Sequence, residues 1–117
     1  MTIWKRSLKK QFMNSKSRDK VLSLLGLAAR GRNLVSGEFS TEKEVKEGKA
    51  ELVIVGGDAS DNTKKMFTNM CAFYKVPIYF YATKDVLGKS IGREMRASVP
   101  VTDRGLATGI MKHLEES

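Results

Sequence analysis

The stretch ELVIVGGD, residues 51–58, holds an uninterrupted aliphatic run that ends in two glycines and an aspartate. A continuous aliphatic run of this length is typical of a central strand covered on both faces. The glycines and the aspartate indicate a turn, and we expect a helix to begin at about Ser60 or Asp61. The apolar residues that recur at helical spacing after it are Met66, Phe67, Met70, Cys71 and Tyr74. The sequence therefore predicts a buried strand followed by a helix that packs through this apolar stripe.

Downstream of this unit, strands and helices are expected to alternate. Pro77 marks the turn into a strand at 78–81, and Thr83 caps a short helix that includes Asp85-Val86-Leu87. A last strand follows at 97–101. Asp103 then caps a final helix, in which the apolar residues Leu106, Ile110 and Leu114 are spaced four apart.

Upstream, a buried helix is expected at 20–30, a short strand at 33–36 and an acidic helix between Gly37 and Gly48. The acidic helix has only two strongly apolar residues, so we expect it to lie exposed along one side. Helices and strands thus alternate almost one for one along the chain. This order is typical of a three-layer α/β/α sandwich around a small parallel or mixed sheet.

Length and charge restrict the class of protein. The 117 residues fit one domain, and 21 Lys and Arg against 13 Asp and Glu give a net charge of +8. Six of these cations and no acid lie in residues 1–18, so the remainder carries only +2. We therefore expect a basic extension over 1–18 and a single domain over 19–117. The extension is expected to be a loose terminus.

Two other interpretations of the extension are open. Trp4, Leu8 and Phe12 would share one face of a helix and could dock on a membrane surface. Met13 could instead be the natural start, because the hydrophobic pattern of the domain begins only near Asp19.

Several kinds of chemistry are disfavoured. One Cys and one His cannot build a structural zinc site, and no phosphate-binding GxxxxGK[ST] motif is present. We expect Cys71 to be a buried, inert thiol, and His113 to complement a helix dipole. A lone Asp58 past a strand is more often a turn or cap residue than an acid or base. We therefore predict a protein without catalysis, metal or cofactor, in a reducing cytoplasmic setting.

Two segments are candidates for binding RNA. One is the start of the acidic helix, residues 37–43, where free backbone N–H groups favour phosphate. The other is the charged segment 92–96. Apolar side chains that could hold splayed bases are Phe39 and Met95, and cations that could contact phosphates are Lys43, Arg93 and Arg96. A structural alternative is that Phe39 packs as a helix staple and that the charges are merely solvated.

The chain also resembles a known family through an ordered set of motifs. These are LLGLAARGRNLVSGE (24–38), GKAELVIVGGDASDNTKK (48–65), YKVPIYFYATKDVLGKSIGRE (74–94) and VTDRGLA (101–107). They resemble the kink-turn RNA-binding ribosomal proteins of the L7Ae and L30e type, above all the bacterial YlxQ-like branch. The resemblance covers roughly residues 19–114. It implies a three-layer α/β/α fold with a mixed sheet of about four strands.

The resemblance also implies a ligand, the kink-turn, which is a sharply bent RNA with tandem sheared G·A pairs. In the family a helix with the motif Gly-x-Asn-Glu-x-x-Lys enters the groove beside these pairs. Here the same frame runs from Gly37 through Glu38 to Lys43, with Phe39 in place of the Asn and Ser40 in place of the Glu. Losing each hydrogen bond to a charged group would cost about 1.5–3 kcal/mol. We therefore expect the helix to contribute less than in relatives.

The family's other contacts map onto Ser60, onto Lys84 before Leu87-Gly88, and onto the closing loop. That loop consists here of Arg93, Glu94, Met95 and Arg96. Its basic residues are expected to offset part of the weakened helix, whereas Glu38 and Glu42 would repel phosphate.

Together these observations predict a monomeric, non-catalytic cytoplasmic protein that binds kink-turn or related structured RNA, such as ribosomal RNA. The alternative is a protein-interaction module of the ribosome or of a translation factor. Its acidic helix, with Glu38, Glu42, Glu44 and Glu47, would suit a basic partner.

Overall fold

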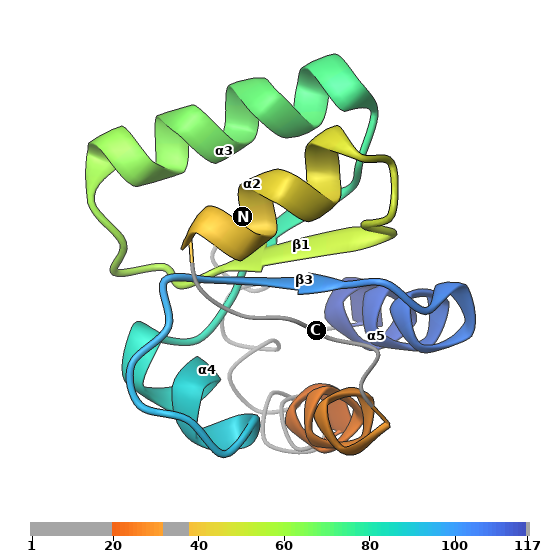
Figure 1. Cartoon of the computed structure of the whole chain (residues 1–117). Coiled ribbons are helices and arrows are strands. Elements are labelled where there is room, and N and C mark those ends of the chain that lie inside the picture. Colours follow the sequence, from red (N-terminus) through yellow and green to blue (C-terminus); the bar gives the residue numbers. More distant parts are fainter. Residues whose placement is uncertain (1–19, 32–37, 117) are drawn as a thin grey trace, which may run out of the picture.

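The computed structural model describes residues 20–31 and 38–116. In these residues the chain forms five helices and three strands (Figure 1). The N-terminal helix covers residues 20–30. It is followed by α2 (Glu38–Lys46), β1 (Leu52–Val55), α3 (Asp61–Tyr74), β2 (Ile78–Phe80), α4 (Lys84–Ser90), β3 (Ser98–Val101) and α5 (Arg104–Glu116). The strand expected at 33–36 lies outside the described residues.

The three strands form one mixed sheet in the order β2-β1-β3. β1 runs parallel to β2, with Val53 opposite Ile78, and antiparallel to β3, with Val55 opposite Ser98. The aliphatic run of β1 is fully buried because a neighbour pairs with each edge and helices cover both faces. The predicted central strand is confirmed.

Helices cover the two faces of the sheet separately, as Figure 1 shows. Successive side chains of a strand point to opposite faces. Accordingly, Leu52 and Ile54 belong to a core cluster with the N-terminal helix, α4 and α5. Val53 and Val55 belong to a second cluster with α2 and α3. The predicted three-layer α/β/α architecture is therefore confirmed.

Three of the described helices begin at a side-chain cap, and the caps at Thr83 and Asp103 were predicted. The Ser60 hydroxyl accepts a hydrogen bond from the amide of Thr63 at 3.2 Å, which begins α3. The Thr83 hydroxyl accepts one from the amide of Val86 at 3.2 Å, which begins α4. The Asp103 carboxylate accepts one from the amide of Leu106 at 2.8 Å. These caps satisfy N–H groups that have no partner within the helix.

Two expectations about exposure were wrong in part. Helix α2 is less exposed than predicted, because it packs against both α3 and β3 and fully buries Thr41 and Val45. The apolar stripe of α3 buries Phe67 and Cys71, but Tyr74 at its end is 41% exposed. The Tyr74 ring packs edge-on against the exposed ring of Phe73, whose centroid is 4.9 Å away.

None of the described helices is both long and apolar enough to cross a bilayer.

Candidate nucleic-acid interface

One edge of the sheet gathers most of the residues that the sequence marks as binding candidates. The carboxyl ends of the parallel strands β1 and β2 meet there, and β3 begins there because it runs antiparallel. Helix α2 is tied to the same edge by a buried hydrogen bond of 2.9 Å between Thr41 Oγ1 and Ser98 Oγ. We call residues 38–43, 56–60, 82–84 and 91–97 the candidate interface. It lies at the left of Figure 1.

Hydrogen bonds join the loops of the candidate interface. The amide of Gly56, just past β1, donates to the carbonyl of Ala97 at 2.9 Å. The carboxylate of Asp58 accepts a hydrogen bond of 2.8 Å from the amide of Lys84, the first residue of α4. The loop after β1 therefore contacts both the start of α4 and the residue that precedes β3. Three segments that are distant in sequence are held as one unit.

The closing loop lies directly on α4. A Cβ atom added to Gly88 would stand 1.6 Å from the carbonyl oxygen of Glu94, so only glycine permits this approach. The amide of Arg93 donates to the carbonyl of Gly88 at 2.8 Å, and the amide of Arg96 donates to the carbonyl of Lys84 at 3.0 Å. The loop is thus fixed by backbone contacts before any ligand binds.

This loop presents an apolar and a basic side chain to solvent. Met95 is 57% exposed, and Arg93 is exposed and forms no ion pair within the described part of the chain. Arg96 is half-buried and donates a hydrogen bond of 2.9 Å from Nη1 to the carbonyl of Met95. Arg93 is therefore available for a phosphate, whereas Arg96 also supports the loop.

Helix α2, which is tied to this edge through Thr41, contributes an exposed cation. Lys43 is exposed and has no ion pair among the described residues, while Ser40 is half-buried. The carboxylate of Glu42 lies 2.7 Å from the ammonium of Lys46, and this hydrogen bond raises the pKa of Lys46. Because Glu42 is paired along its own helix, it repels phosphate less than the sequence predicts.

The structure describes only some of the remaining predicted site residues. Gly37 and the side chains of Glu38 and Phe39 lie outside the described residues, although the backbone of α2 begins at Glu38. Ser60 is exposed, but its hydroxyl already caps α3. Lys84 is half-buried at the start of α4.

Sequence reasoning missed three residues that shape this edge. Asp58 was expected to serve its own turn or a cap, and it joins two loops by bonding the start of α4. Thr41 was not expected to be buried. Gly88 could have been identified from the sequence. A glycine inside a short helix lowers its stability, so its presence in the seven-residue α4 indicates that another segment approaches the backbone there.

Groups suited to covalent or metal chemistry lie elsewhere or are paired. Cys71 of α3 is 1% exposed and belongs to the core cluster that α3 forms with α2 and β1. Burial raises the pKa of its thiol to about 11. His113 lies in the last turn of α5, with Nδ1 3.2 Å from a carboxylate oxygen of Glu116. Among the described residues, no three His, Cys, Asp or Glu side chains group as metal ligands would.

The fold and the candidate interface together define the class: a small three-layer α/β/α protein whose loops form a preformed surface with exposed basic residues at one edge of the sheet. A model of the ribosomal protein L7Ae/L30e/S12e/Gadd45 family matches residues 19–109, and the chain belongs to this family. A curated relative, described as RNA-binding protein YlxQ of Bacillus subtilis, is 47% identical over 92 residues. That alignment covers 79% of this chain and 92% of the relative.

Two solved structures share the fold. A protein of unknown function from Bacillus halodurans superposes with a TM-score of 0.80 at 38% identity, covering 82% of this chain and 97% of the other. The 15.5 kD RNA-binding protein of Giardia lamblia superposes with a TM-score of 0.72 at 23% identity. It covers 86% of this chain and 87% of the other.

Proposed function

We propose that this chain is a non-catalytic, monomeric RNA-binding protein of the cytoplasm that recognises a kink-turn or a related structured RNA through the candidate interface. The observation that carries the proposal is the closing loop. It is held on α4 by the contact of Gly88 with Glu94, and it presents Met95 and Arg93 to solvent, while α2 adds the exposed Lys43. The name of the Bacillus subtilis relative, an RNA-binding protein, supports the same conclusion.

The chemistry of this edge suits a bent RNA better than a regular duplex. An apolar side chain on a fixed loop can cover a base that is flipped out of the stack, and the cations around it can hold the phosphates of both strands. A-form duplex RNA presents no splayed base to such a loop. The loop needs no rearrangement before binding, so less conformational entropy opposes association.

We further propose that the binding unit is the domain over residues 19–117, with 1–18 as an extension. This division is supported by the family model, which begins to match at residue 19.

The alternative, a protein-interaction module, depends on negative charge along α2. Glu42 of α2 lies 2.7 Å from Lys46, and Glu47, just past the helix, lies 3.3 Å from Lys49. These exposed pairs reduce the negative charge offered to a basic partner only in part. The preformed closing loop makes RNA binding the better supported function. Capture of a partner protein that survives nuclease treatment would favour the alternative.

Binding titrations of the full chain test the proposal. The ligands are a kink-turn stem with intact G·A pairs and the same stem with those pairs replaced by Watson–Crick pairs, near physiological salt. We expect clearly tighter binding to the intact kink-turn. Equal affinity for the two stems, or no binding to either, would contradict kink-turn recognition.

A further inference from the structure

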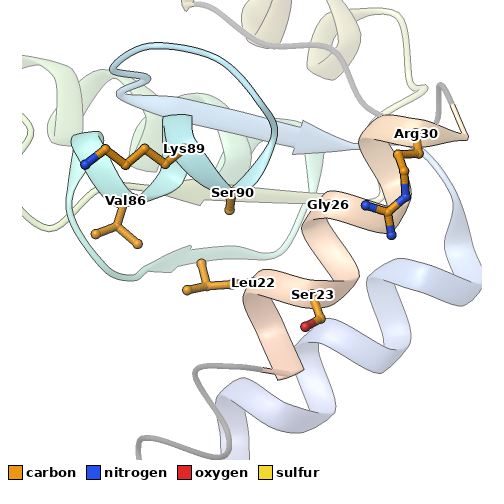
Figure 2. A pocket seen from close by; sticks show the side chains of 7 residues that line it. All are labelled: Leu22, Ser23, Gly26, Arg30, Val86, Lys89 and Ser90. Atoms are coloured by element: carbon orange, nitrogen blue, oxygen red, sulfur yellow. The ribbon is translucent and has the colours of Figure 1, made fainter.

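A second surface feature lies next to the candidate interface. An open groove runs between the N-terminal helix and α4 (Figure 2). On one side it is lined by Leu22, Ser23, Gly26 and Arg30, and on the other by Val86, Lys89 and Ser90. None of these residues belongs to the candidate interface defined above.

The two helices that form the groove approach each other closely at one point, and the groove is open elsewhere. A Cβ atom on Gly26 would lie 3.1 Å from the carbonyl oxygen of Ser90, so the two helices nearly touch there. The same Cβ position is 3.7 Å from Nη1 of Arg30, so the Arg30 side chain lies back along its own helix toward this contact, as Figure 2 shows. Arg30 is exposed and forms no ion pair within the described residues.

The lining suits an anionic strand with an apolar face. Both charged residues that line the groove are cations, Arg30 and Lys89. The Lys89 ammonium is 3.2 Å from the carboxylate of Asp85, but both side chains are largely exposed, and such a pair is weak and exchangeable. Leu22 and Val86 are half-buried and add aliphatic surface to the lining. Phosphate would contact the cations while ribose or base packs on the aliphatic residues.

A hydroxyl in the groove favours RNA further. The Ser90 hydroxyl donates a hydrogen bond of 2.8 Å to the carbonyl of Leu87, so it remains free to accept one. The 2′-hydroxyl of ribose is a donor that could supply that bond.

The groove is also continuous with the closing loop. The amide of Gly92 donates to the carbonyl of Lys89 at 3.1 Å, and Glu94 lies on Gly88, so the loop rests on the helix turn that carries Lys89. A strand that leaves the closing loop along α4 therefore passes the helix turn that carries Lys89, and Arg30 lies across the groove on the N-terminal helix.

We propose that the groove between the N-terminal helix and α4 holds an RNA strand that continues beyond the kink-turn, with a phosphate on Arg30. This inference rests on the proposed function and extends its footprint by one or two nucleotides. Arg30 thereby selects RNAs in which the kink-turn is followed by a single-stranded segment.

The test compares three RNAs with the full chain. One is a kink-turn with two blunt stems, and the others carry a short unpaired oligouridine extension at one or the other stem end. The proteins are the wild type, Arg30→Gln, and Lys112→Gln as a charge-matched control on the exposed surface of α5. Because Arg30 is exposed at the end of its helix, Arg30→Gln should retain the wild-type melting temperature.

We expect one extension to improve binding to the wild type about tenfold, as a charged hydrogen bond would. Arg30→Gln should abolish that gain and lower the salt slope for the extended RNA by roughly one, with the affinity for the blunt RNA unchanged. Lys112→Gln should keep the gain.

Three results would overturn the inference. Tight binding of the blunt kink-turn with no gain from either extension would refute the groove alone. A gain that survives Arg30→Gln would assign the strand to another surface and leave the groove to another class of partner, such as an acidic peptide. Absence of binding to the blunt kink-turn would refute the proposed function, and the groove proposal with it.

Discussion

Phe39 and Ser40 are the residues at which this chain departs from the helix motif Gly-x-Asn-Glu-x-x-Lys of the family that its sequence resembles. The side chain of Phe39 has no hydrogen-bonding group, and that of the half-buried Ser40 has a single hydroxyl. The candidate interface keeps two exposed cations, Lys43 and Arg93. At this scale, affinity is expected to come from the loop and the cations more than from the start of α2.

Restoring the polar pair should strengthen binding. The variant Phe39→Asn with Ser40→Glu should bind the intact kink-turn at least about tenfold more tightly, because it regains hydrogen bonds to base edges. Fluorescence titration against the intact and the Watson–Crick stems would measure the change. Phe39→Ala is the matched control, since it removes the ring without adding a hydrogen bond. An unchanged affinity in the double variant would mean that α2 does not approach the G·A pairs.

Cys71 should be unreactive in the folded protein. Burial raises the pKa of its thiol to about 11, and the thiolate is the reacting form. At pH 8, native protein should label with a thiol reagent far more slowly than protein unfolded in urea. Because the thiol ionises near pH 9 when unfolded and near pH 11 when folded, this group favours the folded state below pH 9. Its contribution is then lost as the pH rises from 9 to 11. Equal labelling rates with and without urea would show that the thiol is accessible.

At the scale of elements, the central feature is the contact between α4 and the closing loop. Helix α4 has only seven residues, yet it carries the loop at Gly88 and donates its first amide to the Asp58 carboxylate. It also forms one wall of the groove that faces the N-terminal helix. The orientation of both proposed RNA contacts therefore depends on this short helix.

Gly88→Ala should lower both the stability of the protein and its affinity for RNA. The new methyl group would overlap the backbone of Glu94 and must displace the loop, at a cost of about 1–3 kcal/mol in the free energy of unfolding. RNA affinity should fall because Arg93 and Met95 move with the loop. Chemical denaturation and titration would measure the two effects.

Gly109→Ala on α5 is the control for this substitution. Its Cβ would meet only the Leu24 side chain, at an ordinary 3.6 Å. It should stabilise the helix by roughly 0.5–1 kcal/mol and leave RNA binding unchanged. Wild-type affinity in Gly88→Ala would show that the position of the loop does not matter.

The sequence predicted elements better than their surroundings. The strand at β1 followed from its aliphatic run, and the caps Thr83 and Asp103 followed from local hydrogen-bonding chemistry. The burial of Thr41 could not be predicted in this way, because its hydrogen bond is to Ser98, 57 residues away. The contact of Gly88 with Glu94 likewise depends on how a loop folds back, and no periodicity encodes that.

The candidate site was predicted as two separate segments, one at the start of α2 and one at residues 92–96. Their proximity comes from sheet topology, since β3 runs antiparallel to β1 and so begins at the edge where β1 ends. Asp58 and Ser60 show the limit of residue-type reasoning. Asp58 was predicted to be a turn or cap residue, and it joins two loops. Ser60, which the resemblance maps onto a ligand contact, caps α3, and its contact with a ligand stays a prediction.

At the scale of the whole molecule, stability and binding depend on different parts of the fold. The sheet and the helices on its two faces form the core, and the loops at one edge form the proposed RNA-binding surface (Figure 1). Charge is distributed unevenly along the chain, because residues 1–18 carry six cations and no acid. Affinity for RNA in general and preference for a kink-turn should therefore have different sources.

Removing residues 1–12 should reveal this division. The shortened chain begins at Met13 and loses four cations, Lys5, Arg6, Lys9 and Lys10. Its affinity for any RNA should fall and its salt slope should decrease by up to about three, since each lost phosphate contact counts for roughly 0.7–0.9. The ratio of affinities for intact and Watson–Crick stems should stay the same. A ratio that falls to one would place kink-turn recognition in the N-terminal segment.

The most direct test of the account is hydrogen–deuterium exchange of the full chain, alone and with saturating amounts of each of the two stems. We predict that the intact kink-turn slows exchange in residues 38–43 and 91–97, while α5 and the C-terminal half of α3 exchange as in the free protein. The Watson–Crick stem should leave the first two segments unprotected. Equal protection by both stems, or protection confined to segments outside this edge, would contradict the claim that it recognises the kink-turn.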